Sequence, residues 1–226
     1  CTPHCLRTEQ PVTQPLSEDE RGPGEFYPVV GVGPHPEPWP TGLQYDAELL
    51  REGDRRNVLD AFRYWTVDAI KAELDTRRHP LHIAIENWQH DLNIGAIVRT
   101  ANAFNVAGVH IVGRKHWNQR GAMVTDRYLP MHHHPDIASF VQWVREHDLE
   151  LIGIDNVPGS APLEHATLPK RCVMLFGQEG PGLSEEAISA SARILHITQY
   201  GSTRSMNASA AGAIAIYAWA MQHLHK

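Results

Sequence analysis

Beyond Pro80 the chain alternates short apolar runs with longer segments of helical periodicity, and this alternation constrains the fold more than any other feature. Apolar runs bounded by polar or glycine-rich residues are typical of buried strands, and we expect strands at 81–85, 109–112, 149–154, 173–176 and 194–197. Helical periodicity predicts helices at 94–105, 137–147, 184–192 and 207–223. Strands that alternate with helices form a mostly parallel sheet with helices on both faces. The sequence therefore predicts an α/β domain at 80–226.

The first part of the chain has a different texture. Residues 1–45 contain nine of the 16 prolines and little periodicity, which predicts an extended arm that lies against the body of the protein or a partner subunit. Residues 46–79 show helical spacing interrupted near Gly53 and Thr66, which predicts two amphipathic helices. The expected organisation is an arm at 1–45, a helical extension at 46–79 and the α/β domain.

Composition limits where the protein works and what it binds. No apolar run approaches the ~20 residues of a membrane span, and no secretory signal is visible, so we expect neither. Three cysteines, Cys1, Cys5 and Cys172, argue against a disulfide framework and favour the cytoplasm. A net charge of −6 gives no support to nucleic-acid binding, which would need a local patch. The arginines between 55 and 78 and the basic residues between 114 and 127 are candidates, but interleaved acids make a solvated charged face equally open.

Two clusters of metal-binding residue types are present, and we expect neither to hold a metal. Cys1, His4 and Cys5 have no second pair at finger-like spacing. Adjacent His132, His133 and His134 cannot all point at one ion from a regular strand or helix, and a loop before a helix at Asp136 is the expected use.

Ligands of parallel α/β sheets sit beyond the carboxyl ends of the strands, and three segments there carry unusual residues. The first, ENWQHDLNIGAIVRTANAF, places Asn93 as a helix N-cap and Arg99 inside a helix that is otherwise apolar. An arginine in such a helix requires an anion or a carboxylate. An anionic ligand and a structural pair with a glutamate are both open.

The second segment, LFGQEGPGLSEEAI, has three glycines that let the backbone approach a ligand closely, followed by a helix start at Ser184. Its glycine spacing matches neither the dinucleotide fingerprint nor the P-loop. Because Glu179 fits a phosphate cradle poorly, we expect a neutral or cationic ligand held by backbone groups.

The third segment, GSTRSMNASAAGAI, places Ser205 and Asn207 at a helix start, followed by small residues that keep the helix slim. Close packing with an asparagine cap explains most of it, but not Arg204 and the hydroxyl groups around it.

Together the motifs NIGAIVRTA, LFGQEGPGLS and STRSMNASAAGAIAIY resemble, in this order, the SpoU (TrmH-like) family of RNA ribose methyltransferases, within the SPOUT class, over about 81–219. The resemblance implies a sheet whose C-terminal part, at about 171–224, forms a deep trefoil knot, and it implies a homodimer. It also implies S-adenosylmethionine as methyl donor and a ribose 2′-hydroxyl in tRNA or rRNA as acceptor.

The same resemblance assigns site residues. The catalytic set is Arg99, Asn93, Glu179, Ser205 and Asn207. The cofactor set is Leu175, Phe176, Gly177, Ile197, Gln199, Gly201, Ser205 and Met206. The helical region at 46–78 resembles the N-terminal helices of family members that bind tRNA, and its arginines, together with Arg204, are our candidate RNA contacts: Arg55, Arg56, Arg63, Arg77, Arg78 and Arg204. A guanidinium stays protonated, so we expect Arg99 to stabilise charge and clamp phosphate rather than act as a base, with Ser205 and Asn207 orienting the hydroxyl.

Two other functions are weighed against this one. A protein of the same fold that binds S-adenosylmethionine and RNA without turnover would fit the net acidity and the unexplained arm. A nucleotide- or NAD-binding enzyme would need a glycine loop after the first strand, where the chain has NWQHDLNIGA. The sequence does not distinguish tRNA from rRNA.

Overall fold

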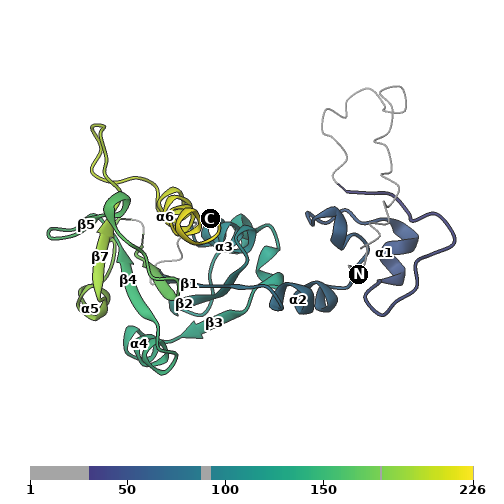
Figure 1. Cartoon of the computed structure of the whole chain (residues 1–226), viewed down its shortest axis with the longest axis horizontal. Coiled ribbons are helices and arrows are strands. Elements are labelled where there is room, and N and C mark those ends of the chain that lie inside the picture. The colour runs from purple at the N-terminus through teal and green to yellow at the C-terminus, as the bar shows by residue number, and fades with distance from the viewer. Residues whose placement is uncertain (1–30, 88–92, 179, 226) are drawn as a thin grey trace, which may run out of the picture. The chain divides into compact units, whose positions relative to one another are not determined.

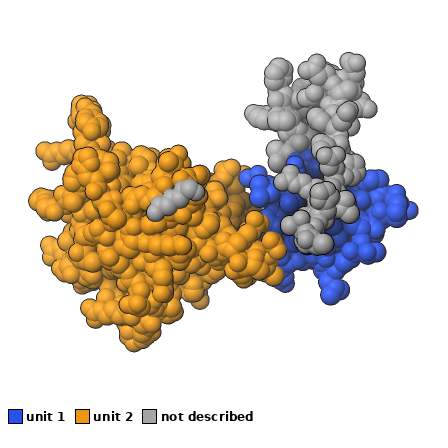
Figure 2. Space-filling view, in the orientation of Figure 1, with its two compact units in different colours: residues 1–70 blue, residues 71–226 orange. Residues whose placement is uncertain are grey.

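The structure is a computed structural model that describes residues 31–87, 93–178 and 180–225. The chain divides into two compact units, residues 1–70 and 71–226, which Figure 2 colours separately. Within the described residues, no helix combines the length and the apolar character that crossing a bilayer requires.

The first unit contains α1 (Ala47–Glu52), a 3₁₀ turn at Asp60–Phe62 and the start of α2 (Val67–Asp75). The two expected helices are therefore present. The Asp46 carboxylate caps α1 by accepting hydrogen bonds from Glu48 N and Leu49 N, and the helix ends at Gly53, whose φ is 94°. Antiparallel bridges join Val32 to Asp54 and Tyr45 to Trp65, so residues 31–45 pair with the segment that follows them.

A buried carboxylate organises this first unit. Asp54 is inaccessible to solvent, and its two oxygens accept hydrogen bonds from Arg56 Nε at 2.8 Å, Arg56 Nη2 at 2.7 Å and Tyr64 N at 3.0 Å. Burial raises the pKa of Asp54, but the hydrogen bonds from Arg56 and Tyr64 outweigh it and hold the pKa below its ordinary value. The carboxylate is therefore charged and paired inside the unit.

The second unit is built on one seven-stranded sheet, in which every pairing is parallel (Figure 1). The strand order is β3-β2-β1-β6-β4-β7-β5. This confirms the predicted parallel α/β sheet, although the sequence missed β3 and the two-residue β5. The strands are β1 (His79–Asn87), β2 (Val106–Gly113), β3 (Met131–His134), β4 (Glu150–Ile154), β5 (Ala161–Pro162), β6 (Cys172–Phe176) and β7 (Arg193–His196).

Helices cover both faces of the sheet, as predicted: α3 and α6 lie on one face and α4 and α5 on the other (Figure 1). Alternate residues of β1 serve the two layers, with Ile83 and Ile85 facing α3 and α6, and Ala84 facing the opposite layer. Three further 3₁₀ turns lie at Arg120–Ala122, Thr125–Tyr128 and Leu163–His165. The helices are α3 (Asn93–Ala103), α4 (Ile137–Glu146), α5 (Glu185–Ala190) and α6 (Ala208–His223).

Polar caps fix where three of these helices begin. Asp136 caps α4, Ser184 caps α5 and Asn207 caps α6, each through a side-chain oxygen that accepts from backbone N–H groups of the first turn. Small residues let α6 approach α3 closely, since a Cβ on Gly212 would lie 3.2 Å from Ile97 Cγ1. The caps therefore hold the helix starts that follow β6 and β7 beside the carboxyl edge of the sheet.

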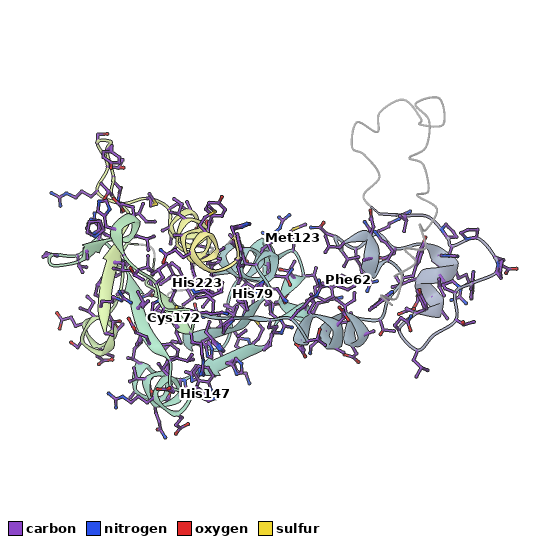
Figure 3. The ribbon with its side chains drawn as sticks, in the orientation of Figure 1. Phe62, His79, Met123, His147, Cys172 and His223 are labelled. Atoms are coloured by element: carbon purple, nitrogen blue, oxygen red, sulfur yellow. The ribbon has the colours of Figure 1, made fainter. Side chains whose placement is uncertain are left out.

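The three adjacent histidines form strand β3, which corrects the expectation of a loop. His132 and His134 alternate with His133, so they share the sheet face that α4 covers. There His110 Nε2 lies 3.1 Å from His82 Nδ1, and His110 Nδ1 lies 2.9 Å from His134 Nε2. The Trp143 ring packs against His110, and His147, labelled in Figure 3 at the end of α4, stacks on Trp143.

We call His82, His110, His132 and His134 the histidine cluster. Burial is the main cause that lowers the pKa of His82 to about 4, and neighbouring imidazoles add to it. The pKa values of His110, His132 and His134 are also lowered, again mainly by burial. The cluster is therefore neutral near pH 7. Cys172, also labelled in Figure 3, lies buried in the sheet, and burial raises the pKa of its thiol to about 12.

Candidate active site

A cavity of about 300 Å³ opens at the carboxyl ends of β4, β6 and β7, beside the start of α6. This is the edge where parallel sheets bind ligands, and the volume is at the lower end of ordinary ligand sites. The lining residues are Ile154, Asp155, Asn156, Phe176, Gly177, Gln178, Gly180, Gly182, His196, Ile197, Gln199, Ser205, Met206, Asn207, Ala208 and Ala211.

The glycine loop after β6 forms a tight turn at the rim of this cavity. Gln178 and Gly182 exchange two backbone hydrogen bonds, with N···O distances of 3.1 and 3.0 Å. Gly182 has φ 74°, and the backbone of Gly182 and Leu183 fills the space that a Cβ on Gly177 would need. Glycines at 177 and 182 are therefore required for this turn, which exposes backbone groups to the cavity.

Asp155 connects the end of β4 to the glycine loop. One carboxylate oxygen accepts from Leu183 N at 2.8 Å and the other from Asn156 N at 2.7 Å. These hydrogen bonds fix a negative charge in the cavity wall.

The first and third sequence segments meet through a pair of asparagines. Asn207 Oδ1 accepts from Ser209 N at 3.0 Å and Ala210 N at 3.2 Å, while Asn207 Nδ2 donates to Asn93 Oδ1 at 2.8 Å. A hydrogen bond also joins the second segment to β1, where the first segment begins, because Ser184 N donates to Glu86 Oε2 at 2.8 Å. All three segments are thus connected around one site.

The predicted catalytic residues are not all brought together by one copy of the chain. Ser205 and Asn207 line the cavity, and Asn93 lies beside it through its bond to Asn207. Asn93 is the first residue of α3 rather than its cap. Arg99 is exposed on α3, and no ion pair joins it to any residue the structure describes, so the glutamate pair that the sequence left open is not found among these residues. Glu179 lies outside the described residues.

Most of the predicted cofactor residues line the cavity, namely Phe176, Gly177, Ile197, Gln199, Ser205 and Met206. Two do not. Leu175 is fully buried in the sheet core, and Gly201 is exposed in the loop between β7 and α6.

The predicted RNA-contacting arginines fall into two groups. Arg56 and Arg63 donate to their own unit, including Arg63 Nη1 to Arg56 O at 2.6 Å. Arg78 likewise donates to Asp75, Asn105 and the Tyr128 carbonyl within the second unit. Three others are exposed, namely Arg55, Arg77, which pairs with Glu73 at 3.7 Å, and Arg204.

Sequence reasoning missed four polar residues of the cavity wall: Asp155, Asn156, Gln178 and His196. The signal for the first two was available, because they directly follow a predicted strand, and the rule applied to three other strand ends applies there too.

The charge of the wall indicates the kind of ligand. Among the residues that the structure describes, no lysine or arginine lines the cavity, whereas Asp155 supplies a carboxylate. The buried Gln178 Oε1 has no hydrogen-bond partner in the described part of the chain, so it can accept from a ligand donor. The apolar walls Phe176, Ile197 and Met206 complete a site suited to a neutral or cationic molecule with an aromatic or aliphatic part.

The chain is similar to known proteins in both sequence and fold. The tRNA (guanosine(18)-2'-O)-methyltransferase of Borreliella burgdorferi is 25% identical over 156 residues, which are 68% of this chain and 72% of that protein. The crystal structure of the A. aeolicus TrmH/SpoU tRNA modifying enzyme superposes with a TM-score of 0.62 at 20% identity, over 70% of this chain and 83% of that one.

A second solved structure shares the fold. It is the SpoU methyltransferase AviRb from Streptomyces viridochromogenes in complex with the cofactor AdoMet, with a TM-score of 0.60 at 22% identity, over 69% of this chain and 65% of that one. The family model described as "SpoU rRNA Methylase family" matches residues 80–217, which hold all three motifs and the whole cavity wall. The chain therefore belongs to the SpoU rRNA methylase family.

Proposed function

We propose that this chain transfers a methyl group from S-adenosylmethionine to a ribose 2′-hydroxyl of RNA. The observation that carries the proposal is the Asn207 to Asn93 hydrogen bond, because it joins the first and third family motifs at a cavity whose wall also holds the glycine loop. The relative from Borreliella is named as a tRNA 2'-O-methyltransferase, and tRNA is accordingly the acceptor we propose first.

The residues of the cavity fit S-adenosylmethionine, which supplies an electrophilic methyl group on a sulfonium. Backbone groups around Gly177, Ile197 and Met206 would hold the adenosyl part between the apolar walls. The Asp155 carboxylate favours a cation in the cavity, and Gln178 Oε1 offers an acceptor to a ligand N–H or O–H.

Ser205 and Asn207 would act on the ribose. The oxygen of Asn207 is engaged by the first turn of α6, and one hydrogen of its Nδ2 is given to Asn93. Only the second Nδ2 hydrogen is free to orient the 2′-hydroxyl or a water. The Ser205 hydroxyl, at the same wall, can both donate and accept, so it can hold the hydroxyl in line. Asn93 acts through Asn207 and is a positioning residue.

Arg99 requires a second copy of the chain. α6 is apolar around its whole circumference, and its stripe Ala210, Ile214, Tyr217 and Met221 is exposed, although the Tyr217 ring has an edge contact with Phe104. A helix that is apolar all round is normally buried. We therefore propose a homodimer through this stripe, with Arg99 on the neighbouring α3 stabilising the developing oxyanion beside or across the interface.

The remaining expectations also belong to the proposal. The deep knot at about 171–224, the arm at 1–45, the extension at 46–79 and a cytoplasmic location rest on the resemblance and on composition. Glu179 keeps its proposed place near the methyl group. Among the RNA contacts, we favour the exposed Arg55 and Arg204, and Arg56, Arg63, Arg77 and Arg78 are secondary because their side chains are paired within the chain.

The test is incubation of the purified protein with methyl-labelled S-adenosylmethionine and total RNA from a strain that lacks the gene. We expect label in RNA, its loss with Ser205→Ala, and no change with Ser189→Ala, a matched serine that is exposed on α5 and does not line the cavity. Binding of both S-adenosylmethionine and RNA without any transfer would instead establish the alternative, a binding protein without turnover. Label in protein alone would reject both functions.

A further inference from the structure

The loop between β7 and α6 carries an aromatic ring that the cavity does not use. Figure 1 shows this connection extending away from the end of the sheet. Tyr200 is 93% exposed there and makes no ring contact or hydrogen bond with any described residue. Gly201, Ser202 and Thr203 complete the loop tip, so the tip has one large apolar group among small polar ones.

Hydrogen bonds hold both ends of this loop, at Thr198 and at Arg204, and they fix where Tyr200 lies. The Glu164 carboxylate accepts hydrogen bonds from the hydroxyl and backbone N–H of Thr198. At the other end, the Arg204 carbonyl accepts from Asn156 Nδ2 at 3.1 Å and from Gln199 Nε2 at 3.3 Å. The hydrogen bond from Gln199 to Arg204 closes the base of the loop, which we call its neck. Tyr200 and Arg204 therefore lie at the two sides of this neck.

A second cavity lies at this neck. Its volume is about 390 Å³, and amide, imidazole, hydroxyl and guanidinium groups line it, including Asn156, His196, Thr203 and Arg204. It shares Asn156, His196, Ile197 and Gln199 with the wall of the first cavity. Its lining in the described part of the chain holds no carboxylate, and Arg204 supplies a cation. A group bound there would therefore lie beside the first cavity, on its Ile197 and Gln199 side, with a chemistry that suits an anion.

We infer that this neck binds a nucleotide that flanks the methylated one, with its base stacked on Tyr200 and its phosphate held in the second cavity by Arg204. The inference rests on the proposed function and names its substrate class, which is RNA whose target nucleotide has an unpaired neighbour. Unpaired bases stack on aromatic side chains, and a guanidinium binds phosphate through two parallel N–H donors. Bases inside a continuous duplex are already stacked and cannot use Tyr200.

Three variants separate stacking from other roles of this loop. Tyr200→Phe keeps the ring, Tyr200→Leu keeps an apolar side chain without a ring, and Arg204→Ala removes the cation. Arg145→Ala is the matched control, because Arg145 is exposed on α4 and belongs to neither cavity. The probe is the same total RNA from a strain that lacks the gene, used in filter binding with labelled RNA and in methyl transfer.

We expect Tyr200→Leu and Arg204→Ala each to weaken RNA binding and raise the KM for RNA by roughly tenfold, from the usual contribution of one stacked base or one charged contact. Tyr200→Phe and Arg145→Ala should match the original protein, and the Kd for S-adenosylmethionine should not change. RNA affinity for Tyr200→Leu equal to that of the original protein would overturn the inference.

Two further results keep this inference distinct from the proposed function. If the protein binds RNA but never methylates it, the proposed function fails, while filter binding still decides the role of Tyr200. If methylation occurs and maps to a nucleotide paired on both sides within a duplex, the proposed function stands and the inference is wrong. Cross-linking of Tyr200 to a protein partner in place of RNA would also overturn it.

Discussion

Arg56 of the first unit and Arg99 and Arg204 of the second unit are used in different ways. Arg56 lies against the buried Asp54 with a side chain only 20% exposed, and its donors are shared between that carboxylate and the Trp65 carbonyl. In the second unit, Arg99 and Arg204 are exposed and make no ion pair within the described residues. An arginine whose N–H donors are hydrogen-bonded within its own unit supports folding, whereas an exposed arginine without an ion pair is available to a ligand. Charge in the sequence alone does not separate the two uses.

The largest expected effect follows from removing an unpaired arginine. Arg99→Ala should lower kcat by about 100- to 1,000-fold, the usual cost of losing one preorganised group that stabilises an oxyanion. Because Arg99 is exposed, thermal stability should change by less than ~0.5 kcal/mol. Steady-state methyl transfer and a thermal melt measure the two.

Arg99→Lys sharpens this prediction, since it keeps the charge and loses the bidentate fork. We expect an intermediate rate. Full turnover at every pH would show that guanidinium geometry is irrelevant.

The next effect is on stability and falls in the first unit. Arg56→Met leaves the Asp54 carboxylate buried without its cation, which should destabilise that unit by about 2–3 kcal/mol, somewhat less than for a fully buried pair. Hydrogen exchange of the Tyr64 amide, which donates to Asp54, reports it directly.

Arg51→Met is the matched control in the same unit. Its pair with Glu52 is 63% exposed on both sides, so exchange should be unchanged within ~0.5 kcal/mol. Equal effects of the two substitutions would remove the distinction between structural and free arginines.

A third effect depends on pH. The pKa values of the histidine cluster lie below the unfolded value of 6.5, so the unfolded chain binds more protons between pH 6.5 and about 4, the pKa of His82. Stability of the second unit is therefore complete above pH 6.5 and falls as the pH drops, by up to about 1.4 kcal/mol per pH unit for His82, and the other histidines of the cluster act in the same direction. Urea unfolding between pH 7.5 and 5 measures the slope.

His82→Asn should flatten that slope, whereas the matched change at the exposed His165 should leave it as it is. A stability that is independent of pH over this range would contradict the neutral, buried cluster.

The smallest effect concerns Arg55, which is exposed in the first unit and makes no ion pair among the described residues. Arg55→Ala should weaken RNA binding a few-fold and reduce the slope of log K against log salt by about 0.7–0.9, as for one phosphate contact. Filter binding at several salt concentrations measures both. An unchanged affinity and slope would remove Arg55 from the RNA contacts.

Much of the fold was predictable because its signals are local. Continuous apolar runs marked five of the strands, and Asp136, Ser184 and Asn207 start the helices at the expected places. Strand β3 was not predicted because three of its residues are histidines, whose burial depends on Trp143 and Phe140 packing over them from α4. That packing is a tertiary property.

The site, like the fold, has features that local sequence predicts and features that depend on distant contacts. The exposure of Arg99 could have been read from its helix, since Ile94, Ile97 and Val98 define one apolar face and Arg99 falls away from it. The contacts of Arg78 with Asn105 and the Tyr128 carbonyl join positions far apart in the chain, so composition could not show that its donors are used.

The position of the transferred methyl group tests the central claim most directly. RNA from a strain that lacks the gene is incubated with the protein and deuterated S-adenosylmethionine, digested to nucleosides and examined by mass spectrometry. We expect heavy methyl on the ribose of one nucleoside, lost with Ser205→Ala and Arg99→Ala and retained with Arg51→Met. Heavy methyl on a base would contradict it.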